Sequence, residues 1–260
     1  MEEPSTFFFF FRNPYFTGVC GPFENLMRRG RVGKDAELGR RAPFLDCRGV
    51  FGPCGTTEPV TLARIGLFGG TFDPPHVGHL VTAVNVRHAL DLDVVILMVA
   101  NDPWQKSNSR DVTSAEDRFA MVEAAVRDVE GLEAGRLEID RGGPSYTADT
   151  LAALALEHPR ATLFTIVGDD AASGFTSWTR ASDVAEMSTL VIVDRPGVQV
   201  ELPNEFSWVR VESPRLEVSS TDLRARFVDG RPLDYLVTQP VLQVIADREL
   251  YGVVRSGAKS

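Results

Sequence analysis

From residue 64 onward, short apolar runs alternate with segments of helical periodicity. The strongest run, Asp93–Ala100 (DVVILMVA), is β-branched and almost wholly apolar, as expected for a strand buried on both faces of a parallel sheet. Further strands are predicted at Arg64–Gly69, Leu137–Ile139, Thr162–Val167 and Thr189–Val193. Strands that alternate with helices are typical of βαβ units. The pattern therefore predicts an α/β fold with a Rossmann-like, doubly wound parallel sheet.

Helical spacing of apolar residues follows most of these strands. The predicted helices are Val77–Leu90, Ser114–Val129, Thr147–Leu156, Thr221–Phe227 and Pro240–Tyr251. Ser114 is the predicted N-cap of its helix, with Asp117 as an acidic residue in the first turn. Ligands of such sheets bind beyond the carboxyl ends of the strands, where the first strand turns into its helix. That turn is therefore the place to look for a site.

Residues 1–63 differ from the rest of the chain. All three cysteines and the run Phe7–Phe11 lie there, and no helical or strand period persists. A sparse, odd set of cysteines without metal-ligand spacing indicates plain thiols of a cytoplasmic chain. Glu2 and Glu3 precede the phenylalanine run, and no cleavage site follows cleanly, which argues against a signal peptide. We expect a disordered extension, or sequence upstream of the true start, followed by a single domain at 64–260.

The charge of the chain limits its partners. Acidic residues outnumber basic ones by 36 to 27, for a net charge of −9. Such a chain has no general electrostatic attraction for nucleic acid or anionic lipid. No stretch approaches the roughly 18–20 apolar residues of a membrane span. We therefore expect a cytoplasmic protein that binds neither nucleic acid nor membrane. Any phosphate would be held in a local site. A homo-oligomer is compatible with the sequence.

The turn after the first predicted strand, Gly69–His79, reads GGTFDPPHVGH. Its two leading glycines allow a ligand to approach the backbone closely. His76 and His79 are three residues apart at a helix start, so their imidazoles project on the same side, and Gly78 between them leaves space for a bulky group. The free N–H groups and partial positive charge of a helix N-terminus favour a phosphate. The turn therefore predicts an anion site.

Other interpretations of this turn fit less well. Two histidines three apart could bind zinc, but no third ligand is apparent nearby. The turn has neither the Lys-Ser/Thr pair of a Walker loop nor the G-x-G-x-x-G fingerprint of dinucleotide sites. No serine or cysteine stands beside a base as a nucleophile. The residues offer backbone donors and two imidazoles to an anion, without a dedicated metal site.

The turn resembles the signature of the HxGH nucleotidyltransferase superfamily, and specifically that of the bacterial nicotinate-nucleotide adenylyltransferases. A second segment, Ser219–Arg224 (SSTDLR), is similar to the family's SSTxxR element. Hydroxyls at a helix start, with an arginine one turn on that can fork onto phosphate oxygens, suit a phosphate. The resemblance spans residues 64–260 and has no counterpart in 1–63. Further similar segments are Pro103–Lys106, Gly143–Leu151, Gly168–Asp169 with Trp178, and Arg195–Gly197.

The resemblance implies transfer of the adenylyl group of ATP to nicotinate mononucleotide, giving deamido-NAD and pyrophosphate. His76, His79 and Arg224 would be catalytic, and Mg²⁺ would arrive with the ATP rather than in a protein site of its own. Nicotinate would lie at Tyr146, Thr147 and Trp178. The implied ATP-binding residues are Gly69, Gly70, Thr71, Phe72, Gly78, Lys106, Gly168, Asp169, Arg195, Ser219, Ser220 and Thr221.

Several of these roles have plainer alternatives. A single tryptophan such as Trp178 commonly packs in a core, although its flat ring suits a pyridine. An exposed lysine such as Lys106 is solvated by default. Tyr146 and Thr147, at a predicted helix start, could supply N–H groups to a carboxylate.

Other functions stay open at this point. Within the superfamily, pantetheine phosphate or nicotinamide mononucleotide could be the acceptor, although the pantetheine enzymes are typically shorter and lack the TYTxDTL and tryptophan elements. A class I aminoacyl-tRNA synthetase would need a KMSKS-like loop and a basic surface for tRNA. A non-catalytic nucleotide-binding module would not need His76, His79 and Arg224 together.

Overall fold

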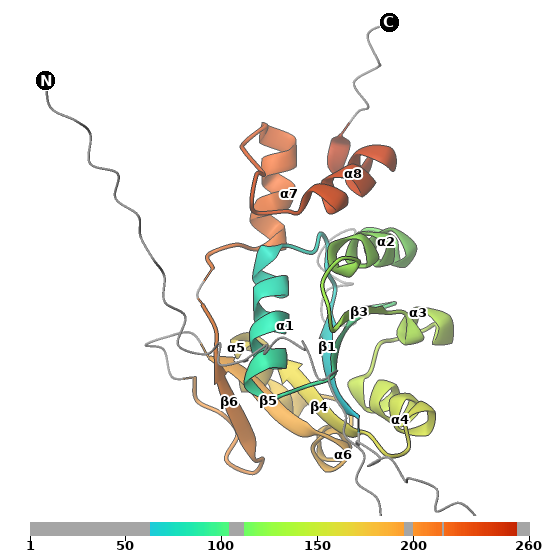
Figure 1. The fold of residues 1–260 in the computed structure, drawn as a ribbon, viewed down its shortest axis with the longest axis vertical. Coiled ribbons are helices and arrows are strands. Elements are labelled where there is room, and N and C mark those ends of the chain that lie inside the picture. Colours follow the sequence, from blue (N-terminus) through green and yellow to red (C-terminus); the bar gives the residue numbers. More distant parts are fainter. Residues whose placement is uncertain (1–62, 104–111, 195–199, 215, 254–260) are drawn as a thin grey trace, which may run out of the picture. The chain divides into compact units, whose positions relative to one another are not determined.

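In the computed structural model, the described residues are 63–103, 112–194, 200–214 and 216–253 (Figure 1). Their strands form one parallel sheet in the order β3-β2-β1-β4-β5-β6. The strands are β1 (Arg64–Gly70), β2 (Val94–Val99), β3 (Leu132–Gly135), β4 (Thr162–Val167), β5 (Thr189–Asp194) and β6 (Trp208–Glu212). The strand order reverses direction between β1 and β4, as in doubly wound sheets. The predicted fold class is confirmed.

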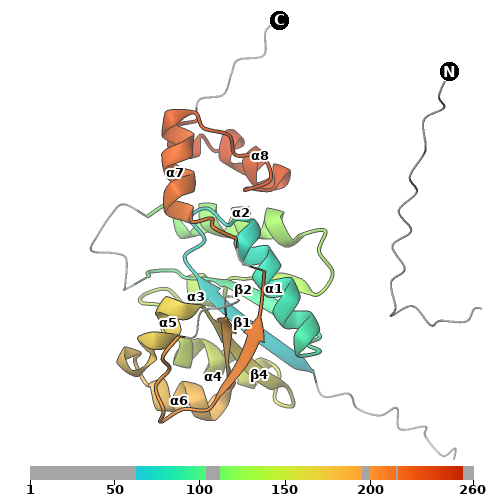
Figure 2. The same ribbon diagram turned by 90° about the vertical axis from the view of Figure 1, so that its left-hand side faces the viewer.

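Helices connect the strands from β1 to β5 and pack against both faces of the sheet. The C-terminal helices α7 and α8, red in Figures 1 and 2, lie beyond the end of the sheet at which β1 runs into α1. The helices are α1 (Val77–Ala89), α2 (Ala115–Val126), α3 (Leu137–Arg141), α4 (Thr147–Glu157), α5 (Asp169–Ser173), α6 (Ala181–Met187), α7 (Ser220–Asp229) and α8 (Gln239–Asp247), with short 3₁₀ turns η1 (Phe175–Ser177) and η2 (Leu250–Gly252). None of the described helices is long and apolar enough to cross a bilayer.

Alternate side chains of β2 enter two different cores. Val95, Leu97 and Val99 belong to a cluster that includes buried residues of α1, α2, α7 and α8. Ile96 and Met98 belong to a second cluster, with buried residues of α4 and α6. Both faces of the strand are covered, which is why its sequence is a continuous apolar run rather than an alternating one.

The predicted strand at Leu137–Ile139 is wrong. Those residues start α3, and the strand in that part of the sheet is β3, five residues earlier. Leu137 packs against one core and Ile139 against the other. Their alternation therefore imitates a strand although the backbone is helical. β3 pairs closely with β2, since a Cβ on Gly135 would stand 2.6 Å from the side chains of Ile96 and Met98.

In the C-terminal half of the chain, other elements differ from the prediction. β6, α5 and α6 were not predicted, and the helix expected over Pro240–Tyr251 ends at Asp247. Glu249 and Tyr251 have left-handed backbones, with φ of 52° and 56°, and so interrupt the helix. The N-cap at Ser114 is confirmed, because its side chain accepts a hydrogen bond from the N–H of Asp117. The expectation for the N-terminal extension lies outside the described residues.

A buried arginine holds the loop that follows β1. Arg118 of α2 is 1% exposed. Its guanidinium donates to the carbonyl oxygens of Thr71 at 2.9 Å, Asn101 at 3.1 Å and Thr113 at 2.8 Å. Thr71 follows β1 and Asn101 follows β2, so one side chain joins the loops at the carboxyl ends of two neighbouring strands. Arginine suits this position because its planar fork presents several donors in fixed directions.

Replacing Arg118 should therefore destabilise the fold. We expect Arg118→Met to lower the free energy of unfolding by about 3 kcal/mol, since three partly buried carbonyl groups lose their donor. Arg118→Lys should recover only part of this loss. Arg127→Met, at an exposed position just after the same helix, is the control and should change stability by less than about 0.5 kcal/mol. Denaturant unfolding measures all three, and equal losses at both arginines would refute this role.

Candidate active site

The loop between β1 and α1 begins with two glycines that serve different purposes. No atom lies within 4 Å of the point where a Cβ of Gly69 would stand, and Gly69 lines two adjoining cavities. A Cβ on Gly70 would stand 2.7 Å from the ring of Phe72. Gly69 therefore keeps the cavity wall open to a ligand, whereas Gly70 makes room for a buried aromatic ring.

That aromatic ring supports one of the two histidines. Phe72 is 2% exposed and has a left-handed backbone, with φ of 51°. Its ring meets the imidazole of His79 edge to face, with centroids 4.9 Å apart, and also meets Phe68. Phe72 borders the larger cavity, as its expected role in ATP binding requires. Its ring contacts indicate that it also fixes the orientation of His79.

The two histidines stack on each other at the start of α1. Their ring centroids are 3.7 Å apart with 24° between the planes, so they share a side as predicted. The N–H of His76 donates to Nδ1 of His79 at 3.2 Å, which favours the tautomer of His79 with its proton on Nε2. The space at Gly78 is occupied by protein: a Cβ there would stand 3.0 Å from His76 and from Val218.

His76 is set apart by its burial. The residue is 7% exposed, and its Nδ1 is buried without a hydrogen-bond partner. Burial lowers the pKa of His76 to about 4, because the charged imidazolium is poorly solvated there. At neutral pH His76 is therefore an uncharged imidazole. It can exchange a hydrogen bond with a ligand, but it brings no positive charge to the site.

The start of α7 is bonded to the same loop. Ser220 donates its hydroxyl to the carbonyl oxygen of Pro74 at 2.8 Å. Arg224 donates from Nη1 to the carbonyl oxygen of Asp73 at 2.6 Å, and from Nη2 to the hydroxyl of Thr221 at 3.1 Å. The two sequence signatures, about 150 residues apart, thus meet in space. Two helix N-termini, those of α1 and α7, border one cavity.

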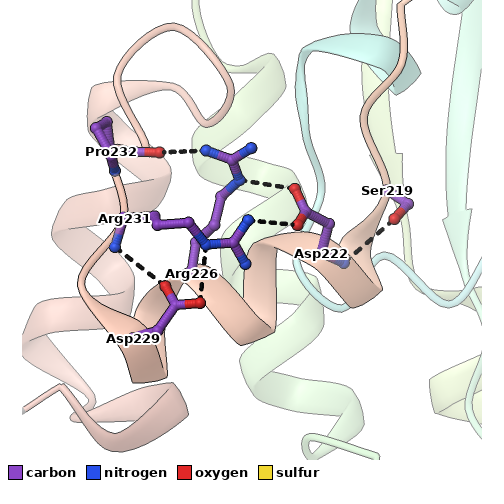
Figure 3. Close-up of polar contacts among 6 residues, drawn as sticks. All are labelled: Ser219, Asp222, Arg226, Asp229, Arg231 and Pro232. Carbon is purple, nitrogen blue, oxygen red and sulfur yellow. Dashed lines mark hydrogen bonds and ion pairs between the residues drawn. The ribbon is translucent and has the colours of Figure 1, made fainter.

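Two further arginines, one in α7 and one just after it, do not line that cavity. Asp222 accepts from Arg226 at 2.7 Å and from Arg231 at 3.0 Å, and Arg231 also bonds Asp229 (Figure 3). The hydrogen bond from Arg226, with help from Arg231, holds the pKa of Asp222 below its usual value. Ser219 caps the helix by accepting from the N–H of Asp222. These pairs lie at or near the surface and contribute little stability.

The larger cavity has a volume of about 610 Å³. Its wall at one end combines the histidine pair with the first turn of α7 and Arg224. At the other end it is formed by residues that follow β4, β5 and β6, including Gly168, Asp169 and Ser213. Gly168 is the N-cap of α5, and Asp169 is its first residue. The predicted ATP-binding residues of the described chain therefore gather around one cavity.

A smaller cavity of about 250 Å³ adjoins the first. Both are lined by Gly69, Gly70 and Thr71. The smaller one is also lined by Trp178 and by Tyr146 with Thr147, the N-cap and first residue of α4. The side chain of Tyr146 does not cap this helix. The N–H of Asp149 bonds the carbonyl oxygen of Tyr146, so the N–H groups that a ligand would use are those nearer the start of α4. All three residues expected to bind nicotinate lie here.

Trp178 also packs in the core, which was the alternative to a role in ligand binding. Its ring lies against Phe175, with centroids 5.2 Å apart. Its buried Nε1 has no hydrogen-bond partner. The tryptophan is therefore both a core residue and a wall of the cavity. Lys106 and Arg195, the remaining predicted ATP ligands, lie outside the described residues.

Three residues of the site escaped the sequence reasoning. Ser213, 5% exposed, follows the unpredicted strand β6, lines the larger cavity and has a buried hydroxyl without a partner. Glu138, 6% exposed, lines the smaller cavity and accepts from the hydroxyl of Thr150 at 2.7 Å. Asp73, 1% exposed, belongs to the loop signature itself. Only Asp73 stood in a segment that the sequence marked as functional.

The buried His76 should make stability depend on pH. Because its pKa is lowered in the fold, the unfolded chain binds a proton at His76 between about pH 6.5 and 4, where the folded chain does not. The free energy of unfolding is therefore not reduced by His76 above pH 6.5. Below that pH it falls as the pH decreases, by at most about 1.4 kcal/mol per pH unit.

His76→Asn should remove that dependence, so the stability difference between wild type and variant should shrink as the pH is lowered from 7.5 to 4.5. Urea unfolding across this range measures it. His88→Asn, at an exposed histidine of the same helix, is the control for loss of an imidazole. If the free energies of unfolding of wild type and His76→Asn differed by the same amount at every pH, the claim that His76 is a neutral, buried imidazole would be contradicted.

Comparisons with known proteins agree with this geometry. The family model for cytidylyltransferase-like proteins matches residues 67–226. The "Probable nicotinate-nucleotide adenylyltransferase" of Corynebacterium kroppenstedtii is 43% identical over 192 residues, which cover 72% of this chain and 90% of that protein. The protein of the same name from Corynebacterium glutamicum is 41% identical over 201 residues, covering 75% of this chain and 92% of the relative.

A solved structure shows the same fold. The nicotinic acid mononucleotide adenylyltransferase of Plasmodium falciparum, in complex with NaAD, superposes with a TM-score of 0.60 at 16% identity. The match covers 74% of this chain and 98% of that one. At this identity the likeness speaks for the fold, and the family assignment rests on the closer relatives. The chain belongs to the cytidylyltransferase-like proteins and, among them, to the nicotinate-nucleotide adenylyltransferase family.

Proposed function

We propose that the protein transfers the adenylyl group of ATP to nicotinate mononucleotide, with deamido-NAD and pyrophosphate as products. The observation that carries this proposal is the pair of cavities that adjoin at Gly69–Thr71. One is bordered by two helix N-termini and Arg224, and the other by an aromatic ring beside the start of α4. The names of the relatives support the same pair of substrates.

The reaction needs no nucleophile from the protein. An oxygen of the acceptor's 5′-phosphate attacks the α-phosphorus of ATP, the bond from that phosphorus to the oxygen bridging to the β-phosphate breaks, and pyrophosphate leaves. Such transfers depend on positioning and charge stabilisation. The common wall of the two cavities, Gly69–Thr71, is where the two reacting phosphates would meet.

The triphosphate would lie at the histidine end of the larger cavity. Arg224 supplies the fixed positive charge there, and the first turn of α7, with Ser219 and Thr221, supplies polar donors. Ser220 gives its hydroxyl to Pro74, so its part in phosphate binding falls to its backbone N–H. The two histidines would donate hydrogen bonds to the oxygens on which charge develops.

The nucleoside would occupy the other end of the same cavity. Asp169, which follows β4 and lines this cavity beside Gly168, would accept from a ribose hydroxyl. Ser213 offers a buried hydroxyl to the same moiety. Lys106 and Arg195 keep their expected roles at the phosphates and the adenosine.

The acceptor would place its pyridine ring on Trp178 and its carboxylate at the start of α4. One observation favours a second acceptor, nicotinamide mononucleotide: Glu138 lines the same cavity, and a carboxylate there would repel the carboxylate of nicotinate. Two features offset it. The hydroxyl of Thr150 bonds Glu138, and the N-terminus of α4 carries partial positive charge. We therefore keep nicotinate as the preferred group.

Mg²⁺ enters this proposal as an ion bound to the phosphate oxygens of ATP, where it would neutralise charge on the leaving pyrophosphate. The larger cavity is also lined by carboxylates, among them those of Asp169 and Asp170, and Mg²⁺ prefers such oxygen ligands. In the part of the chain that the structure describes, no cluster of three or more His, Cys, Asp or Glu side chains is arranged to hold a metal ion. The cytoplasm remains our proposal for the location, resting on the cysteine usage.

Pyrophosphate release with alternative acceptors tests the function. We expect kcat/KM with nicotinate mononucleotide to exceed that with nicotinamide mononucleotide by at least about 10-fold, since a carboxylate accepts stronger hydrogen bonds than an amide. Equal efficiency with both acceptors would contradict the choice of nicotinate. Turnover with pantetheine phosphate alone, or with no acceptor, would contradict the proposed function as a whole.

His79→Ala is the companion variant in the same assay. It should lower kcat by at least about 100-fold, the scale of losing one donor to developing charge, while the fold survives. His88→Ala, on the same helix but exposed, should leave kcat unchanged.

A further inference from the structure

A hydrogen bond from Tyr251 links the C-terminal segment to the signature loop. The hydroxyl of Tyr251 donates to Oδ1 of Asp73 at 2.6 Å, across 178 residues of sequence. Asp73 is 1% exposed, so this bond lies inside the protein. The backbone carbonyl of the same aspartate accepts from Nη1 of Arg224 at 2.6 Å. Asp73 is therefore held through its side chain by Tyr251 and bonded through its backbone to Arg224.

Two further contacts hold the side chain of Tyr251, one to its ring and one to its hydroxyl. The ring stacks on Phe227 of α7, with centroids 5.2 Å apart and 26° between the planes. Its hydroxyl also lies 3.8 Å from the sulfur of Met121 in α2. The backbone of Tyr251 is left-handed, with φ of 56° and ψ of 27°, which costs an aromatic residue free energy. The contacts of the ring and hydroxyl offset that cost and fix where the hydroxyl points.

Tyr251 stays a hydrogen-bond donor over the working pH range. Burial and the neighbouring Asp73 carboxylate both raise the pKa of its phenol above the ordinary value. Tyr251 itself lines neither of the two cavities, so its path to the substrates passes through Asp73.

The next residues of the loop are held by the same C-terminal region. The N–H of Val77, the first residue of α1, donates to the carbonyl oxygen of Leu236 at 3.0 Å. Ser220 bonds Pro74. Tyr251 supplies the bond to the loop's only carboxylate, and a buried carboxylate is the group that most needs a donor.

We propose that Tyr251 is a positioning residue for adenylyl transfer: through Asp73 it sets the place of Arg224 and of the histidine-bearing start of α1. This inference rests on the proposed function. Without the hydroxyl, the carboxylate of Asp73 loses a buried donor and the loop shifts. Arg224 then meets the triphosphate in a less productive place, which affects the transition state more than the binding of the acceptor.

The test is Tyr251→Phe, which removes the hydroxyl and keeps the ring that stacks on Phe227. We expect kcat to fall by about 5- to 50-fold, while KM for nicotinate mononucleotide stays within about 2-fold. Tyr235→Phe, at a tyrosine that is 93% exposed, is the matched control and should leave both constants unchanged. A kcat of Tyr251→Phe equal to that of wild type would overturn the proposal.

A double-mutant cycle separates positioning from general destabilisation. In an Arg224→Lys background, Tyr251→Phe should cause little further loss of kcat, because the group that it positions is already altered. A loss of the same factor in both backgrounds would show that the hydroxyl acts independently of Arg224, against the proposal.

A readout without turnover keeps this inference distinct from the proposed function. Hydrogen exchange at the amide of Val77 should be faster in Tyr251→Phe than in wild type, with exchange in β2 unchanged. If wild type shows no adenylyl transfer, the proposed function fails, yet this exchange still tests the link from Tyr251 to the loop. If hydrogen exchange at Val77 were the same in both proteins, the proposed link from Tyr251 to the loop would be refuted.

Discussion

Everything in this site depends on how the carbonyl groups of one loop are bonded. Between β1 and α1, the carbonyl oxygens of Thr71, Asp73 and Pro74 accept from Arg118, Arg224 and Ser220 respectively. These donors come from α2 and α7, so the loop cannot take its shape until distant parts of the chain have packed. A loop held in this way presents its glycines to both cavities and aims the start of α1 at the larger one. Preorganisation of this kind is what a reaction without protein nucleophiles requires.

Two histidines at a phosphate site suggest that the imidazoles supply its positive charge. The structure favours another source. The stacked imidazoles are close enough that two positive charges would repel, and His76 is kept neutral by burial. Fixed positive charge comes instead from Arg224 and from the ends of α1 and α7. An acidic chain, with a net charge of −9, can thus bind a polyanion through local groups alone.

The sequence predicted those parts of the fold whose signal is local. Four of the predicted strands, β1, β2, β4 and β5, are apolar runs that are covered on both faces, and each matches a segment of the sheet. β6 escaped because it lies at the edge and buries one of its five residues, Val211. The two signature segments could be identified as phosphate-type helix starts for the same reason, since hydroxyls, glycines and an arginine at fixed spacing are local features.

The contacts that assemble the site were beyond sequence reasoning. Arg118 appears in the sequence as an ordinary helix residue, and only its burial among three carbonyl groups gives it a role. Tyr251 stood at the end of a predicted helix and instead leaves the helix to reach Asp73. Apart from Thr113, which is five residues from Arg118, these partners are 17 to 178 residues apart, and nothing in their local pattern marks them. The long-range hydrogen bonds of buried side chains could therefore not be predicted from the sequence and were found only in the structure.

A crystal structure of the protein with deamido-NAD bound would test the central claim most directly. The account predicts the pyridine ring on Trp178 in the smaller cavity, the adenosine beside Asp169 in the larger one, and the pyrophosphate bridge passing Gly69–Thr71 near His79. A dinucleotide with both halves in the larger cavity, or with its pyridine ring beside the histidine pair, would contradict it.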